Sequence, residues 1–252
     1  MKILLWAECQ KLRRSNILLL ALFATIFIAA IVFIGGKTTV DGVDFVENNG
    51  WYMATTLTWA TMFILPAMIA LIGSYMICRE EQDGTIKHLR LIPIDERKLT
   101  AAKMSVTFVL SVLIYLLLFV MTFGIEAALH FSALSMKTVL GFLKMYLIQG
   151  GSMFFAVSPI IAIVPYAKKS YWLALLLAEI YSFSGLFMSM SARLKTFYPI
   201  TAAFGVSGYY DTTAQNRIYS AVVLALCGCL AAFLLAGLNR NQKGKAHEED
   251  AV

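Results

Sequence analysis

The chain has 252 residues, of which 60% are hydrophobic and 14% are charged. Its mean hydropathy of +0.74 excludes a water-soluble globular domain as the main architecture. The formal net charge of +6 indicates no nucleic acid partner, because membrane topology and anionic membrane lipid account for basic residues that lie beside apolar runs.

The apolar residues are collected in six runs with few or no charges, each long enough to cross about 30 Å of hydrocarbon as a helix. The sequence therefore predicts an all-α integral membrane protein with one transmembrane domain over residues 1–252. Its six predicted spans lie at about 17–35, 57–78, 104–126, 144–165, 171–191 and 218–238, and a tail follows at 239–252.

The basic residues that flank the spans predict that both termini lie in the cytoplasm. With that orientation, 15 of the 21 Lys and Arg residues fall on the inner side and 6 on the outer side. Residues 1–16 precede the first span and are predicted to form a helix on the inner membrane surface. The charged residues of this surface helix include Glu8, Lys11, Arg13 and Arg14.

Residues 79–103 are intensely charged, with 11 charges in 25 residues between the second and third spans. A segment of this composition does not enter lipid. We therefore predict a water-exposed loop on the inner side, with Glu80, Glu81 and Asp83 exposed and available to a soluble partner.

The same loop carries signals of local structure. Gly84 favours a break at the end of the second span. Thr85 is predicted to cap a short helix, and Ile86 and Leu89 give that helix an apolar edge. A further helix is predicted to begin at Glu96 and to run on into the third span.

No catalytic constellation can be assembled from the sequence. Residues 35–38 imitate the end of a phosphate-binding loop, but Ile31 stands where that loop needs a glycine. A catalytic serine needs a general base. Ser207 has no histidine in a later span to act as that base, since only His247 follows it, in the tail. The histidines and cysteines lack the spacing of a metal site. We predict no catalytic residue, no metal and no cofactor held by this chain.

Glu179 lies within the fifth predicted span, where a carboxylate is costly unless it is neutral or has a polar partner. It either contacts a transported molecule or a gate, or it makes an interhelical hydrogen bond as a protonated carboxyl. Residues 193–217 are unusually apolar for an outer loop and are predicted to dip into the headgroup region. With Glu179 they form a candidate exit route, whose aromatic residues include Phe197, Tyr198 and Tyr209. Glu126, at the outer end of the third span, is expected to be a simple interfacial acid.

The second span is followed by Glu80-Glu81-Gln82-Asp83-Gly84-Thr85, and then by Leu89, Leu91 and Pro93. This pattern resembles the permease subunits of type 2 ABC exporters, in which a Glu-rich, Gly-Thr-containing coupling helix precedes a proline. Residues 8–15 are similar to the amino-terminal surface helix of that family, and the six spans extend the resemblance over nearly the whole chain. Gln82 departs from the pattern, because the family commonly has an acid two residues before the glycine.

A chain of this size without a large outer domain is similar to the lantibiotic-immunity branch of the family. The resemblance implies a transport subunit, not an enzyme, in the bacterial plasma membrane. Its partners would be two cytosolic ATPase subunits, which hold ATP and Mg²⁺, a second permease that is a copy or a homologue, and membrane lipid. The residues implied in coupling to the ATPase are Glu80, Glu81, Asp83, Gly84, Thr85, Ile86 and Leu89.

The function implied by that branch is expulsion of amphipathic antimicrobial peptides from the membrane, which gives immunity or resistance. The alternatives are a type 2 exporter of another amphiphile, such as a drug or a lipid, and an ATPase-independent six-span membrane protein.

Overall fold

The computed structural model of the protein describes residues 2–13, 15–37, 39–40, 43–84, 96–130, 134–167, 171–191 and 193–249. Within these ranges the fold is all-helical, apart from one two-residue antiparallel pair, β1 (Thr39–Val40) with β2 (Val43–Asp44). Six helices in the described ranges are long and apolar enough to cross a membrane. This confirms the predicted fold class. The six are Ile17–Gly36, Trp51–Glu80, Arg97–His130, Met136–Tyr166, Trp172–Ser189 and Ala214–Gly237.

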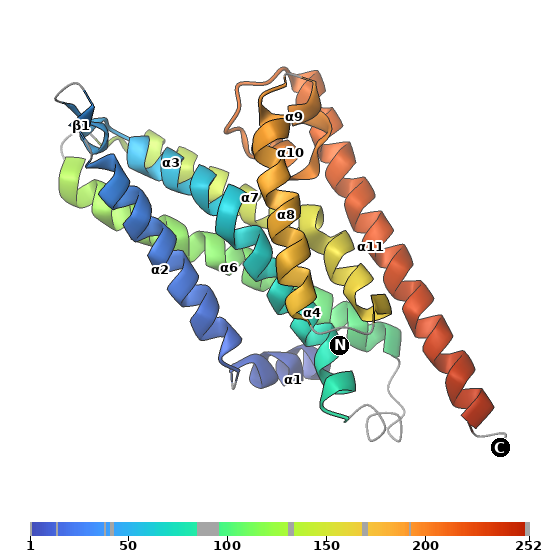
Figure 1. The fold of residues 1–252 in the computed structure, drawn as a ribbon. Helices are drawn as coiled ribbons and strands as arrows, with labels where there is room; N and C mark the ends of the chain where they lie inside the picture. Colours follow the sequence, from blue (N-terminus) through green and yellow to red (C-terminus); the bar gives the residue numbers. More distant parts are fainter. Residues whose placement is uncertain are drawn as a thin grey trace.

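The helices follow one another with short connections. In chain order they are α1 (Lys2–Arg13), α2 (Ile17–Gly36), η1 (Phe45–Glu47), α3 (Trp51–Trp59), η2 (Ala60–Ile64), α4 (Leu65–Gln82), α6 (Glu96–His130), α7 (Met136–Ile163), η3 (Val164–Ala167), α8 (Trp172–Ser189), α9 (Leu194–Phe197), α10 (Pro199–Ser207) and α11 (Ala214–Glu249). Figure 1 shows α1 lying across the end of the bundle where α4 ends, whereas β1, α9 and α10 lie at the opposite end.

The second span is the centre of the bundle. It is 78% buried, against 28% for the first span and 22% each for the fifth and sixth. It also begins at Trp51, earlier than the predicted start at residue 57, and it is not a uniform α-helix. Between α3 and α4 the turn η2 is π-helical, and the hydroxyl of Ser182 on α8 lies 2.8 Å from the carbonyl oxygen of Met62 within it.

The α6 and α7 helices pack closely side by side. At Gly150 of α7, an added Cβ would lie 3.0 Å from the backbone Cα of Val112 on α6. The Ser111 hydroxyl donates to the Gly150 carbonyl oxygen at 2.6 Å. Backbone atoms cannot rotate away as a flexible side chain can, so this contact requires glycine.

Residues 193–217 differ from the predicted loop. They contain α9 and α10, and most of α10, including Ile200 and Phe204, is completely buried. The helix packs against α7, α8 and α11. The apolar composition of this segment therefore reflects burial inside the bundle, which satisfies its backbone polar groups within a helix.

Candidate functional site

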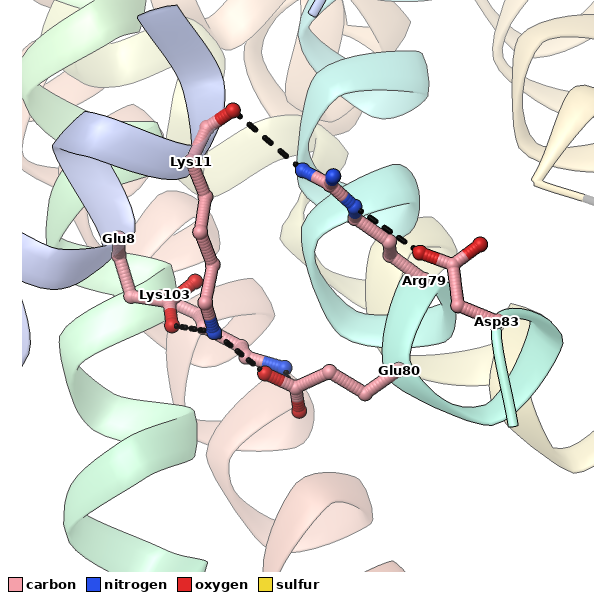
Figure 2. Close-up of polar contacts among 6 residues, drawn as sticks. All are labelled: Glu8, Lys11, Arg79, Glu80, Asp83 and Lys103. Atoms are coloured by element: carbon pink, nitrogen blue, oxygen red, sulfur yellow. Dashed lines mark hydrogen bonds and ion pairs between the residues drawn. The ribbon is translucent and has the colours of Figure 1, made fainter. Parts of the chain in front are cut away.

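A cluster of ion pairs joins α1 to the adjacent ends of α4 and α6 (Figure 2). The ammonium of Lys11 on α1 lies 2.7 Å from Glu8 Oε1 and 2.8 Å from Glu80 Oε1 on α4. The ammonium of Lys103 on α6 lies 2.6 Å from the other oxygen, Glu80 Oε2. Glu80 therefore accepts a charged hydrogen bond on each oxygen, from two helices that are far apart in the sequence.

Most of this cluster is shielded from solvent. Glu8 is 3% exposed, Glu80 is 8% exposed and Lys103 is 4% exposed. Lys11 is more open, and burial alone would lower the pKa of its ammonium. Hydrogen bonds and charge attraction from Glu8 and Glu80 outweigh that effect and raise the pKa above its usual value of 10.5. A buried carboxylate with two cations is a strong geometric constraint, because removing Glu80 leaves the buried ammonium of Lys103 without an ion-pair partner among the described residues.

Arg79 adds a second link between α4 and α1. Its Nη1 donates to the backbone carbonyl oxygen of Lys11 at 3.4 Å, which lies in the last turn of α1, where carbonyl groups lack intrahelical partners. Its Nε donates to Asp83 Oδ2 at 3.2 Å, and its guanidinium lies 5.4 Å from the centre of the Tyr75 ring. The side chain of Arg79 thus spans from one helix to the other.

The end of α4 matches its sequence signal. The last α-helical residue is Gln82, and Gly84 has a φ of +66°. This left-handed conformation ends helices and is readily adopted only by glycine. The predicted break at Gly84 is therefore confirmed. From Glu96, its first described residue, α6 runs on into the third span, as predicted.

The structure brings Glu8, Lys11 and Glu80 together, which the sequence placed in two separate groups. The expectation that Glu80 is exposed is wrong, because Lys11 and Lys103 enclose it. Arg13 and Asp83 are exposed. Of the remaining predicted coupling and surface-helix positions, Arg14, Thr85, Ile86, Leu89 and the side chain of Glu81 lie outside the described residues.

Sequence reasoning missed Lys103 as a member of the cluster. Its one signal is that it is the last charge before the long apolar run of the third span, a position from which a cation can reach a carboxylate at the end of a neighbouring helix. The sequence did not indicate that Lys103 and Glu80 form an ion pair, because 23 residues separate them.

The aromatic residues of the predicted exit route have separate contacts in the structure. The hydroxyl of Tyr198 donates to the Tyr181 carbonyl oxygen on α8 at 2.5 Å. Phe197 stacks on Tyr219 of α11, with 6.1 Å between ring centres, and Tyr209 packs on Phe204 at 5.2 Å. Each aromatic residue thus has its own neighbours.

Glu179 lies on α8, half-buried, and it makes no hydrogen bond or ion pair with another residue in the described part of the chain. It borders an outward-facing stripe of α8 in which Leu176 is 54% exposed and Ile180 is 60% exposed. The interhelical hydrogen bond offered as one interpretation of Glu179 is therefore not seen among these residues.

Glu126 is not the simple interfacial acid that was expected. It is fully buried, and its Oε1 accepts a hydrogen bond from the Gly50 backbone N–H at 2.7 Å. Gly50 directly precedes α3, where a carboxylate is favoured by the helix dipole. His130 Nδ1 lies 3.1 Å from the same oxygen. Glu126 thereby holds the end of α6 against the start of α3, at the end of the bundle opposite the ion-pair cluster.

Among the described residues, no group of three or more His, Cys, Asp or Glu side chains could hold a metal ion. The ion-pair cluster can transmit movement between helices, because it joins α1 to α4 and α6. It lies within reach of the charged residues 79–103 that connect the second and third spans.

Six apolar helices in the described ranges define the chain as a multi-pass membrane protein. Residues 4–185 match the model of a family described as ABC-2 family transporter protein. This match covers well over half of the chain and includes the ion-pair cluster, the first four spans and most of α1 and of the fifth span. The chain belongs to this family and is the membrane subunit of an ABC transporter. No curated protein gives a significant match to the chain.

Proposed function

We propose that the chain is the permease subunit of an ATP-driven exporter that expels lantibiotics or similar antimicrobial peptides from the membrane. Family membership supports the transporter part of this proposal, and it disfavours the ATPase-independent alternative. The lantibiotic substrate rests on the resemblance to the lantibiotic-immunity permeases, which is supported by the short outer connections between the predicted spans. An exporter of a drug or a lipid is the second candidate.

The observation that carries the proposal is the cluster of Glu8, Lys11, Glu80 and Lys103. It lies where the second span gives way to the charged segment that would dock on an ATPase. Since α1, α4 and α6 are bonded through one carboxylate, a force applied to the segment between α4 and α6 is transmitted to all three helices. A bundle with two stable arrangements would be biased in this way by ATP binding elsewhere.

The partners proposed are two cytosolic ATPase subunits, which bind ATP and Mg²⁺, and a second permease. The outward-facing stripe of α8 supports the second permease. Glu179 lies beside that stripe with no polar partner of its own among the described residues, and a carboxyl group at membrane depth is stable beside a polar neighbour or water. An interface with another permease would supply Glu179 with a polar neighbour or with water.

The end of the bundle that carries α1 is proposed to face the cytoplasm of a bacterium. Reporters placed near Lys87 and after Val252 should then give a cytoplasmic signal, and reporters near Asp44 and Thr212 an external one. An external signal near Lys87 would place the coupling segment out of reach of an ATPase and would overturn the proposal.

The substrate is tested by purifying the chain together with its ATPase and measuring ATP hydrolysis in proteoliposomes. Added lantibiotic should stimulate hydrolysis severalfold, and cells that express the complex should tolerate more of the peptide. A matched control is the same complex with a catalytically inactive ATPase. Stimulation by lipids or drugs but not by any cationic peptide would select the second candidate.

A further inference from the structure

A groove of about 340 Å³ lies between α6, α7 and α11, near the end of the bundle at which α6 begins. Most of its lining is apolar, and it includes Met104 of α6, Phe154 of α7 and Leu235 of α11. Arg97, in the first turn of α6, also lines the groove and is exposed. The groove therefore has an apolar body and a cationic residue at one end.

The groove follows α11, and the Phe155 ring lies at the end of the groove away from Arg97. On α11 it extends from Gly228 to Ala236, which corresponds to about 12 Å along a helix that rises 1.5 Å per residue. At Gly228 an added Cβ would lie 2.9 Å from the Phe155 ring, so that ring covers the helix there. From Phe155 toward Arg97, small side chains such as Ala231 and Ala232 leave the space open.

This shape selects the chemistry of an occupant. The groove lies along the sixth span and the start of the third, so its surroundings are hydrocarbon and the adjacent headgroup region. A flexible apolar chain fits between the helices, and a negatively charged head is attracted to Arg97 and to Lys98 beside it. Basic pockets between transmembrane helices commonly hold the head groups of anionic lipids.

We propose that this groove binds an anionic phospholipid, with one acyl chain between α6, α7 and α11 and the phosphate against Arg97. The lipid is a bound partner of the permease and is separate from the transported molecule. It closes the space between α11 and the remaining bundle, and it thereby links the sixth span to α6, which carries Lys103 of the ion-pair cluster.

The test is native mass spectrometry of the full chain after incubation with equal amounts of dioleoyl phosphatidylglycerol and dioleoyl phosphatidylcholine. These lipids share their acyl chains, so the comparison isolates the head group. Wild-type protein should retain phosphatidylglycerol about fivefold better, since one basic residue near anionic lipid contributes about 1 kcal/mol. Arg97→Gln should remove the preference, and Ala232→Leu, which fills the groove, should lower retention of both lipids.

Two variants serve as matched controls and should behave as wild type. Arg193→Gln removes an exposed arginine at the opposite end of the bundle, and Ala225→Leu adds the same bulk to an exposed position of α11 two turns from Ala232. Arg97→Lys keeps the charge and should keep the preference, which separates the loss of charge from misfolding.

Three results would overturn the proposal. One is equal retention of the two lipids by wild-type protein. Another is retention by Arg97→Gln and Ala232→Leu at the wild-type level. The last is a wild-type protein that retains no lipid and forms a dimer, together with an Ala232→Leu variant that is monomeric. That result would assign the groove to a second copy of the chain.

Discussion

Glu80→Gln tests the ion-pair cluster most directly, because it keeps the size of the side chain and removes its charge. In the structure Glu80 neutralises Lys103, whose side chain is 5% exposed. Glu80 is the one ion-pair partner of Lys103 within the described ranges. Glutamine would leave that ammonium buried without a carboxylate, whereas Lys11 would still have Glu8.

The expected loss of stability follows from this difference between Lys103, which would lose its ion-pair partner, and Lys11, which would keep one. Breaking a buried ion pair by removing one partner costs about 3–5 kcal/mol. We expect about 3 kcal/mol for Glu80→Gln, the lower end of that range, because water reaches the cluster on the Lys11 side. Lys103→Met should cost less, about 1–2 kcal/mol, since Glu80 then keeps Lys11 as its partner. The loss of stability in the double variant should be smaller than the sum of the two single losses by about 2 kcal/mol, as expected for residues in direct contact.

The assay is reversible unfolding in mixed detergent micelles, with the free energy of unfolding taken from the denaturant titration. Asp83→Asn is the matched control, because Arg79–Asp83 is an exposed pair, worth about 0–1 kcal/mol. The Glu80→Gln effect should persist at about 0.5 M salt, since buried pairs are screened little. A Glu80→Gln protein within about 0.5 kcal/mol of wild type would refute the view that the cluster holds the three helices together.

Three further perturbations follow from the packing and the charges. Gly150→Ala should lower the free energy of unfolding by about 1–3 kcal/mol by overpacking, whereas Gly151→Ala, whose Cβ would meet Phe108 at 3.6 Å, should be neutral or slightly stabilising in the same titration. Glu126→Ala should cost about 2 kcal/mol by removing hydrogen bonds from a buried carboxyl, and a cost below about 0.5 kcal/mol, the value expected for a surface substitution, would contradict its structural role. The stability that Lys11 contributes is complete below pH 10.5, its usual pKa, and is lost as the pH rises through its raised folded-state pKa. The difference in stability between wild type and Lys11→Met should therefore shrink above pH 10.5, and it should stay constant below that pH while Glu80 remains ionised.

The parts of the fold that sequence predicts well are those set by composition along the chain. Uncharged runs locate the six spans, because crossing hydrocarbon requires about 20 consecutive apolar residues in a helix. Gly84 and Glu96 mark a helix end and a helix start, because left-handed backbone and helix entry each have local residue preferences. Such features depend on neighbours in the sequence, which the chain itself displays.

The parts it predicts poorly depend on lateral neighbours in the bundle. Glu80 reads as an exposed acid, because its charged neighbours in sequence imply water, yet its actual partners are 69 and 23 residues away. Glu126 reads as an interfacial acid because it stands at the outer end of the third span, although its partner Gly50 is 76 residues away. The apolar residues of α10 indicate burial equally in lipid or in protein, and hydropathy does not distinguish the two.

The π-helical turn at Ala60–Ile64 changes how the second span must be mapped. A π-turn adds one residue to a helix, so every position after it is rotated by about 100° relative to an uninterrupted helix of 3.6 residues per turn. A helical wheel drawn through residues 51–80 in one register therefore assigns α4 side chains to the wrong face. Cysteine-accessibility scans of this span should be analysed as two separate periodic series that meet at the turn. Deleting one residue within the turn would merge the two series into one and leave the Glu80 end of the helix facing α1, because the regular helix then has the residue count that the π-turn already matches.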